Sequence, residues 1–307
     1  MLIGLISFLI IYNRLAGIPH LKAQVIFWLS NPKIIGAMIL ALFFMPLNWG
    51  IECYKWKLIT HQIEPISYKT SIKSVLTGIC LGNIAPGRSM EFIAKIFFFK
   101  SENRPSITIL HFINGMFQML ITISIGTCAI IYKFNHQIQS SLIFYVIILG
   151  GVILAFIFCF AIFNISYIQR RLKFIKWFKW NESTKALFFS KKLILQLFSL
   201  SICRNVVFTF QFYLIYTLLS GSSFILQTIT SIAGYFMLTS IIPMISVIEP
   251  AIRAAIALFV FDNYHDGSLS IVLSSTFLWL INVILPSLMG YIIILKEKID
   301  FKSKHVI

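Results

Sequence analysis

The sequence predicts an all-α, polytopic membrane helix bundle, and three observations support this fold class. Hydrophobic residues make up 58% of the 307 positions and charged residues 12%, whereas a soluble domain carries roughly 25% charged residues. Apolar runs such as 141–163 and 268–295 recur along the chain and exceed the ~20 residues that cross a bilayer. The 26 Lys and Arg residues gather between such runs, as they do in the cytoplasmic loops of membrane proteins.

The net charge of +16 is what the positive-inside rule and attraction to anionic lipid produce in an integral membrane protein. We therefore expect no nucleic-acid partner. The first residues, "MLIGLISFLII", lack the basic n-region and small-residue cleavage site of a secretory signal peptide. We expect a single integral membrane domain over 1–307, without a soluble catalytic domain.

The distribution of basic residues predicts the orientation of the helices. Segment 164–192 and the tail after residue 295 are rich in Lys and Arg, whereas 220–223 and 262–267 contain none. The basic segments should be cytoplasmic and the other two external. Both termini are then expected in the cytoplasm.

The expected elements follow in order along the chain. Six full spans are predicted, with two re-entrant segments between them, and a bundle of eight conventional spans is the alternative. The first helix is followed by an interfacial segment to about residue 33. The spans are 1–12, 34–51, 105–131, 142–163, 193–219 and 268–295, and the re-entrant segments are 70–100 and 225–261.

Both re-entrant segments are predicted from breaks in apolar sequence. In "GNIAPGRSMEFIAK" (82–95), Pro86 and Gly87 interrupt an apolar segment that has lysines on both flanks. In "PMISVIEP" (243–250), Pro243 and Pro250 interrupt another. The 11 residues that follow, 251–261, reach about 16 Å as a helix, roughly half a bilayer. Irregular backbone at membrane depth requires protein or a wet cavity around it.

Five charged residues are expected inside the membrane: Arg88, Glu91, Arg204, Glu249 and Arg253. Each costs about 2.5–3.5 kcal/mol at the bilayer centre, so such residues usually face an interior site. Three bases and two acids leave a surplus positive charge, which suits a phosphate because Arg presents a planar fork of donors. Alternatively, these residues satisfy one another as internal ion pairs, such as Glu91 with Arg204 and Glu249 with Arg253.

Other polar residues have structural interpretations. His111, Asn114 and Gln118 share one helix face and are expected to form helix–helix hydrogen bonds. Five tryptophans near predicted boundaries are expected as interfacial anchors: Trp28, Trp49, Trp56, Trp177 and Trp180. Segment 170–180 is predicted to be a basic amphipathic helix on the cytoplasmic leaflet.

"GNIAPGRSMEFIAK" resembles a motif of the lysylphosphatidylglycerol synthase transmembrane-region family of flippase-like membrane proteins. "NWGIECYKWKLI" (48–59) and "SIIPMISVIEPAIRAAIALF" (240–259) resemble two further patterns of that family. The matching positions are Gly82, Asn83, Pro86, Arg88, Glu91, Pro243, Ser246 and Glu249. The chain departs from the family at Met90, Val247 and Ile248, which replace glycines, and at Lys95, a basic residue one place late.

The resemblance implies movement of a lipid or lipid-linked headgroup between leaflets of a bacterial plasma (inner) membrane. The ligand would be a membrane phospholipid, with an anionic one preferred. The headgroup-binding residues would be Asn83, Arg88, Glu91, Lys95, Arg204, Glu249 and Arg253. This function needs no nucleophile, metal or cofactor, and no G-x-x-x-x-G-K-[ST] loop is present.

Two alternatives to a lipid transporter remain open. An integral-membrane enzyme of lipid or glycan synthesis would need clustered carboxylates to hold Mg²⁺, but all three aspartates follow residue 260. A non-catalytic partner of a lipid-modifying enzyme or glycosyltransferase is the second alternative. We expect a transporter rather than an enzyme.

Overall fold

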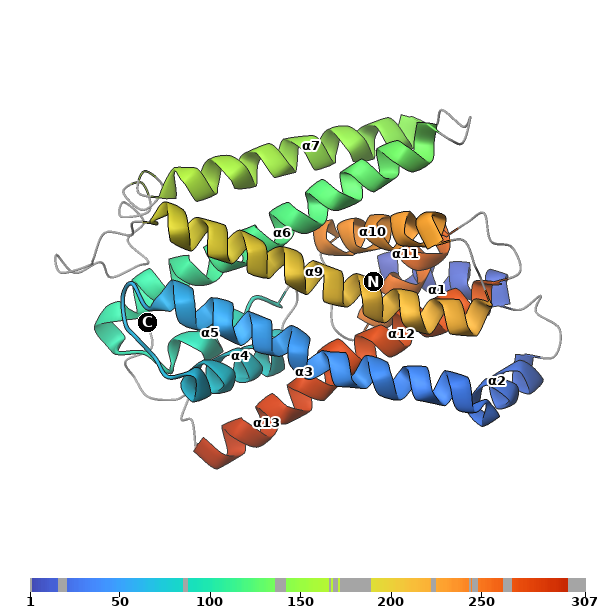
Figure 1. Ribbon diagram of the computed structural model, residues 1–307, viewed down its shortest axis with the longest axis horizontal. Helices are drawn as coiled ribbons and strands as arrows, with labels where there is room; N and C mark the ends of the chain where they lie inside the picture. Colours follow the sequence, from blue (N-terminus) through green and yellow to red (C-terminus); the bar gives the residue numbers. More distant parts are fainter. Residues whose placement is uncertain are drawn as a thin grey trace. The chain divides into compact units, whose positions relative to one another are not determined.

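The described part of the chain consists of helices and their connections. The computed structural model describes residues 2–15, 21–84, 88–135, 142–165, 167, 171, 189–221, 225–242, 244, 248–261 and 267–297. Across these ranges all regular secondary structure is helical, and no strand occurs (Figure 1). The all-α class predicted from the sequence is confirmed.

The helices follow one another along the sequence with these bounds. The amino-terminal part contains α1 (Leu2–Leu15), α2 (Leu21–Ser30), α3 (Pro32–Thr60), α4 (Tyr68–Gly82), α5 (Glu91–Ile96) and the 3₁₀ turn η2 (Ser101–Asn103). The middle part contains α6 (Arg104–Asn135), α7 (Leu142–Phe163) and α9 (Lys191–Ser220). The carboxyl-terminal part contains α10 (Ile225–Ile241), α11 (Glu249–Val260), α12 (Ser268–Trp279), the π-helix η4 (Leu280–Ile284) and α13 (Leu285–Glu297).

Five helical segments in the described ranges are long and apolar enough to cross a membrane. They are Pro32–Thr60, Ser101–Lys133, Tyr145–Phe163, Lys191–Ser220 and Ser268–Glu297. The protein is therefore a multi-pass membrane protein. Of the six predicted spans, the first falls short of this length, because the 14 residues of α1 reach about 21 Å against a hydrocarbon core of ~30 Å.

The second predicted span ends later than expected. We predicted an end near residue 51, but α3 continues to Thr60. The reason is that Glu52 and Lys55 are buried and do not mark a solvated helix end. The Thr60 hydroxyl donates to the Trp56 carbonyl, 2.8 Å away, within the last turn of the helix.

The chain divides into two compact units. The first unit comprises Met1–Asn48, Thr122–Val152 and Asn205–Ile284, and the second comprises Trp49–Ile121, Ile153–Arg204 and Leu285–Ile307. The divisions fall within α3, α6, α7 and α9 and at the end of η4.

The first unit has an aromatic core between α9, α10 and α11. The rings of Phe212 and Phe261 stack at 5.8 Å, and Tyr216 and Tyr235 pack against the same pair. The segment 225–261, predicted as a broken hairpin, forms α10 and α11, which contact each other. Pro250 is in the first turn of α11, where a missing N–H breaks no helical hydrogen bond. Pro243 lies outside the described residues.

A chain of buried amides also lies in the first unit. Asn48 donates to Asn282 across 3.0 Å, and Asn282 donates to Gln211 across 3.2 Å. Gln211 in turn donates to the Ala41 carbonyl across 2.8 Å. Asn282 belongs to the π-helix η4. The chain links α3, α9 and η4 without a charge.

In the second unit, α4 runs along the last turns of α3 in the same direction. Three positions of α4 pair with positions of α3 that precede them by 18 residues. Tyr68 donates to the Gly50 carbonyl and Ser71 to the Cys53 carbonyl. Trp56 donates to the Ser74 hydroxyl. Because the three pairs are each about one turn apart, they fix both the direction and the register of α4.

A break separates α4 from α5, as predicted for 70–100. Helix α4 ends at Gly82 with Asn83 as its C-cap, and α5 begins at Glu91 and packs back on α4. A Cβ on Gly82 would lie 3.0 Å from the Glu91 Cβ, so the hairpin closes tightly there. Pro86 and Gly87 lie outside the described residues. The depth of this hairpin in a membrane stays a prediction.

Helix α13 packs against α4 at very close range. A Cβ on Gly290 would overlap the backbone carbonyl of Leu76. Near this contact, Asn83 Nδ2 donates to Ser287 Oγ, and Lys73 forms an ion pair with Glu297. Glycine at position 290 therefore permits the approach of the two helices.

We predict that Gly290→Ala lowers the free energy of unfolding by roughly 1–3 kcal/mol, because the methyl group forces α13 away from α4. Thermal unfolding of purified protein in detergent measures the change. Gly115→Ala is the matched control, since nothing lies within 4 Å of a Cβ there, and it should stabilise by up to ~1 kcal/mol. Equal melting temperatures for the two variants would contradict the prediction.

Candidate functional site

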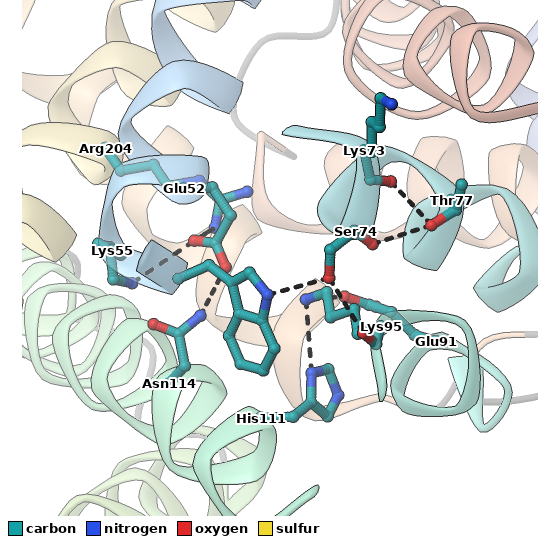
Figure 2. A network of polar contacts seen from close by, with 11 residues as sticks. Glu52, Lys55, Lys73, Ser74, Thr77, Glu91, Lys95, His111, Asn114 and Arg204 are labelled. Carbon is teal, nitrogen blue, oxygen red and sulfur yellow. Dashed lines mark hydrogen bonds and ion pairs between the residues drawn. The ribbon is translucent and has the colours of Figure 1, made fainter. Parts of the chain in front are cut away.

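A group of buried charged and amide side chains surrounds Glu52 in the second unit. Arg204 from α9 places Nη1 3.0 Å from Glu52 Oε2, and Asn114 from α6 donates to Oε1 across 2.6 Å. Lys55 lies one turn after Glu52 on α3, with Nζ 3.6 Å from Oε2. We call Glu52, Lys55, Asn114 and Arg204 the Glu52 cluster (Figure 2). One carboxylate thus contacts groups from three helices.

Lys55 is the most unusual member of the Glu52 cluster. Its side chain is 0% exposed, and its ammonium group makes no hydrogen bond to any residue that the structure describes. Its ion pair with Glu52 is longer than a hydrogen bond. Buried charges normally need hydrogen bonds as well as an opposite charge to offset desolvation. The three N–H donors of Lys55 are therefore suited to an anionic oxygen supplied by a ligand.

Two tryptophans that we predicted as interfacial anchors instead belong to the interior of the second unit. Trp49 is buried, and its ring faces the Arg204 guanidinium at 4.9 Å, a distance typical of a cation–π contact. Trp56 is fully buried and donates to Ser74. The interfacial prediction is wrong for Trp56, because its indole N–H has a protein partner and its ring is enclosed.

A second group of charges surrounds Lys95 in the same unit. Lys95 Nζ lies 2.8 Å from Glu91 Oε1, 3.4 Å from His111 Nδ1 and 5.2 Å from the centre of the Trp56 ring. We call Lys95, Glu91 and His111 the Lys95 group. Its lysine is almost fully buried, with 2% of the side chain exposed.

The side chain of Ser74 links Trp56 to the Lys95 group. Trp56 Nε1 donates to Ser74 Oγ across 3.0 Å, and Ser74 Oγ donates to the Lys95 carbonyl across 3.2 Å. Figure 2 shows Ser74 and Lys95 on one side of the view and Glu52, Lys55 and Asn114 on the other. Trp56 directly follows Lys55 in the sequence, so the two groups are joined through one turn of α3.

Glu91 is outside the membrane-spanning helices, and its charge state follows from its neighbours. Burial acts to raise the pKa of the Glu91 carboxyl, but Lys95, with further contributions from His111 and Arg88, holds this pKa well below its ordinary value. Glu91 is therefore a carboxylate at neutral pH and balances Lys95.

Arg88 and Asn83 lie in the turn before this group. Helix α5 begins at Glu91, and Arg88 has a φ of 56°. Arg88 is therefore in the left-handed region before the helix and, despite its spacing of three positions, does not share a helix face with Glu91. Such a conformation is uncommon for a residue other than glycine. Asn83 donates to Ser287, so one of its amide protons is used between α4 and α13.

The internal ion pairs differ in part from those expected. Glu249 and Arg253 pair with each other in the first unit, where Arg253 Nε and Nη2 each lie 2.8 Å from Glu249 Oε1. The predicted pair of Glu91 with Arg204 is wrong, because Glu91 pairs with Lys95 and Arg204 with Glu52. The role of Glu249 and Arg253 as headgroup ligands stays a prediction.

The hydrogen bonds expected from the third predicted span are present for all three of its residues. Asn114 donates to Glu52 of α3, and Gln118 donates to the Ser201 carbonyl of α9. His111 Nδ1 is hydrogen-bonded to Lys95 Nζ of α5. All three residues connect helices, as predicted.

Sequence reasoning did not select Glu52 or Lys55 for the site. Lys55 is one of the lysines that precede the apolar segment interrupted at Pro86, and such flanking lysines are typical of a cytoplasmic loop. The sequence feature that could have indicated them is their spacing: Glu52 and Lys55 are three positions apart, in the segment between Trp49 and Trp56. This spacing places an acid and a base on one face of a mostly apolar helix.

Comparison with known proteins identifies no relative: no protein-family model, no curated protein and no solved structure matches this chain. Within the described ranges, no three His, Cys, Asp or Glu side chains gather as a metal site would require. The Glu52 cluster and the Lys95 group are therefore interpreted from their own chemistry. They combine cations, amides and tryptophans, which together can hold an anion.

We predict that Ser74→Ala lowers the free energy of unfolding by roughly 1–3 kcal/mol, since it leaves the buried Trp56 N–H without an acceptor. Denaturant unfolding followed by tryptophan fluorescence measures the loss. Thr77→Val is the matched control, because the Thr77 hydroxyl donates to the Lys73 and Ser74 carbonyls of its own helix. The expectation fails if Ser74→Ala costs no more than Thr77→Val.

Proposed function

We propose that the protein binds the anionic headgroup of a membrane lipid or lipid-linked molecule and moves it between the two leaflets. The observation that carries this proposal is the surplus of buried positive charge in the second unit. Lys55, Lys95 and Arg204 face two carboxylates, Glu52 and Glu91. An anionic ligand would neutralise the remaining charge.

The position of these charges favours a lipid ligand. Glu52, Lys55 and Arg204 lie on helices long and apolar enough to span a membrane. A charged side chain there costs about 2.5–3.5 kcal/mol on insertion scales, so a lone surplus cation is expensive to maintain. A phosphate headgroup has its own negative charge and acyl chains that remain in the hydrocarbon. It can supply the missing anion at that depth.

The groups available suit binding and release rather than covalent chemistry. Lysine, arginine and asparagine hold an anionic oxygen through charge and hydrogen bonds. The Trp49 ring contacts Arg204, and the Trp56 ring contacts Lys95. This supports transport of the headgroup without modification.

The resemblance to the lysylphosphatidylglycerol synthase transmembrane-region family supports the same function. Three of its motif positions, Asn83, Arg88 and Glu91, are in or beside the hairpin that contains Lys95. Membership of that family and location in a bacterial plasma membrane are part of the proposal.

Leaflet exchange in liposomes tests the proposed function. We expect the reconstituted protein to accelerate exchange of a fluorescent anionic phospholipid over a zwitterionic one, measured by quenching of the outer-leaflet dye. Lys95→Met should slow this exchange roughly tenfold or more, because it removes a buried cation from the site. Arg88→Ala should also slow it.

Lys100→Met is the matched control, since it makes the same charge change at an exposed position and should leave exchange unchanged. Folded wild-type protein that exchanges none of the lipids would overturn the proposal. Equal losses in Lys95→Met and Lys100→Met would show that bulk charge, and not the site, governs exchange.

A further inference from the structure

The Glu52 carboxylate forms ion pairs with the same cations that an anionic headgroup would bind. Its Oε2 atom lies 3.0 Å from Arg204 and 3.6 Å from Lys55. Its Oε1 atom accepts the hydrogen bond of Asn114. A carboxylate and a phosphate present similar charged oxygens to such donors.

We propose that Glu52 is a resident competitor for the headgroup: it holds Arg204 and Lys55 while the site is empty and yields them to the ligand. This inference rests on the proposed function, because it concerns affinity and release at the same site. It assigns a specificity-determining role to Glu52, which lies within segment 48–59 but is not among the matching motif positions.

Two atoms of the Glu52 cluster that make no hydrogen bond within the described residues mark where a ligand would begin to bind. The Lys55 ammonium makes no hydrogen bond within the described structure, and Asn114 Oδ1 has no donor there either. Lys55 thus keeps hydrogen-bonding capacity for an anionic oxygen while the pair of Glu52 with Arg204 is intact. In this proposal the ligand makes its first contact without separating that buried ion pair.

The charges then set how tightly the headgroup is held. Two cations and one carboxylate leave a single surplus positive charge, which a headgroup with a net negative charge balances. Glu52 remains beside the bound phosphate, and the repulsion between them weakens binding. A transporter benefits from this, because a ligand must bind well enough to enter and weakly enough to leave.

Removing the charge of Glu52 should consequently strengthen binding and slow release. Glu52→Gln keeps the size of the side chain and an oxygen to accept from Asn114, but it removes the negative charge that faces Arg204 and Lys55. A residue with a purely structural role would act differently: its loss would lower stability without raising affinity for an anion.

Lipid binding in detergent micelles tests this inference on the full chain. Wild type, Glu52→Gln and the control Glu102→Gln, which removes an exposed charge, are titrated with short-chain phosphatidic acid, short-chain phosphatidylcholine and inorganic phosphate. Tryptophan fluorescence reports binding, because Trp49 contacts Arg204 and Trp56 contacts Lys95. Melting temperature gives a second readout, since a ligand stabilises the state that it binds.

We expect Glu52→Gln to lower the dissociation constant for phosphatidic acid by about tenfold or more, with Glu102→Gln unchanged and phosphatidylcholine bound weakly by all. Unchanged or weaker binding by folded Glu52→Gln would overturn the inference. Inorganic phosphate bound as tightly as phosphatidic acid would overturn the assignment of a lipid ligand.

Glu52→Asp keeps the test decisive if Glu52→Gln does not fold. It preserves the charge but is one methylene shorter, so it withdraws from Arg204 and Lys55 and should also bind phosphatidic acid more tightly than wild type. Equal affinity would count against the inference. Tighter binding by the variants together with no leaflet exchange by wild type would reject the proposed function and keep the competitor role of Glu52.

Discussion

The ion pair between Glu52 and Arg204 is the interaction on which the second unit depends. One carboxylate accepts from Arg204 on α9 and from Asn114 on α6, and it comes from α3, so three membrane-spanning helices meet at two oxygen atoms. Loss of one partner of a buried pair typically costs 3–5 kcal/mol, because the other charge is left unpaired. Because the ion pair forms only when both side chains face each other at the same depth, it constrains the rotation and depth of these apolar helices more narrowly than apolar packing does. It also brings Trp49 onto the guanidinium and turns Lys55 into the interior.

The α4–α5 hairpin depends on the same turn of α3. Trp56 follows Lys55 and donates to Ser74, which in turn donates to the Lys95 carbonyl. The Lys95 group is thereby held at a fixed distance from the Glu52 cluster by one indole ring and one hydroxyl group. A headgroup that altered the pairing of Glu52 would act on the turn that carries Trp56, and this gives a physical connection between the two groups. In the first unit, Glu249 and Arg253 form an ion pair within α11.

The sequence predicted the parts of this structure that depend on residues close together in the chain. The bounds of α6, α7 and α9 follow from the lengths of apolar runs, and the breaks before α5 and α11 follow from proline, glycine and charge in apolar sequence. The pair of Glu249 with Arg253 was foreseeable because four positions separate them on one helix. Glu52 was missed because its partner Arg204 is 152 positions away, and no local pattern specifies which acid meets which base. Without a sign of that partner, Lys55 had the character of a lysine in a cytoplasmic loop. The end of α3 was therefore predicted too early, near residue 51 instead of Thr60.

The most direct test of this account is a cryo-electron microscopy map of the protein in nanodiscs that contain anionic phospholipid. We predict headgroup density within hydrogen-bonding distance of Lys55 Nζ, between α3, α6 and α9, with the carboxylate of Glu52 displaced from Arg204. A map in which Glu52 keeps its contacts with Arg204 and Asn114, with lipid headgroups confined to the two membrane surfaces, would contradict the account.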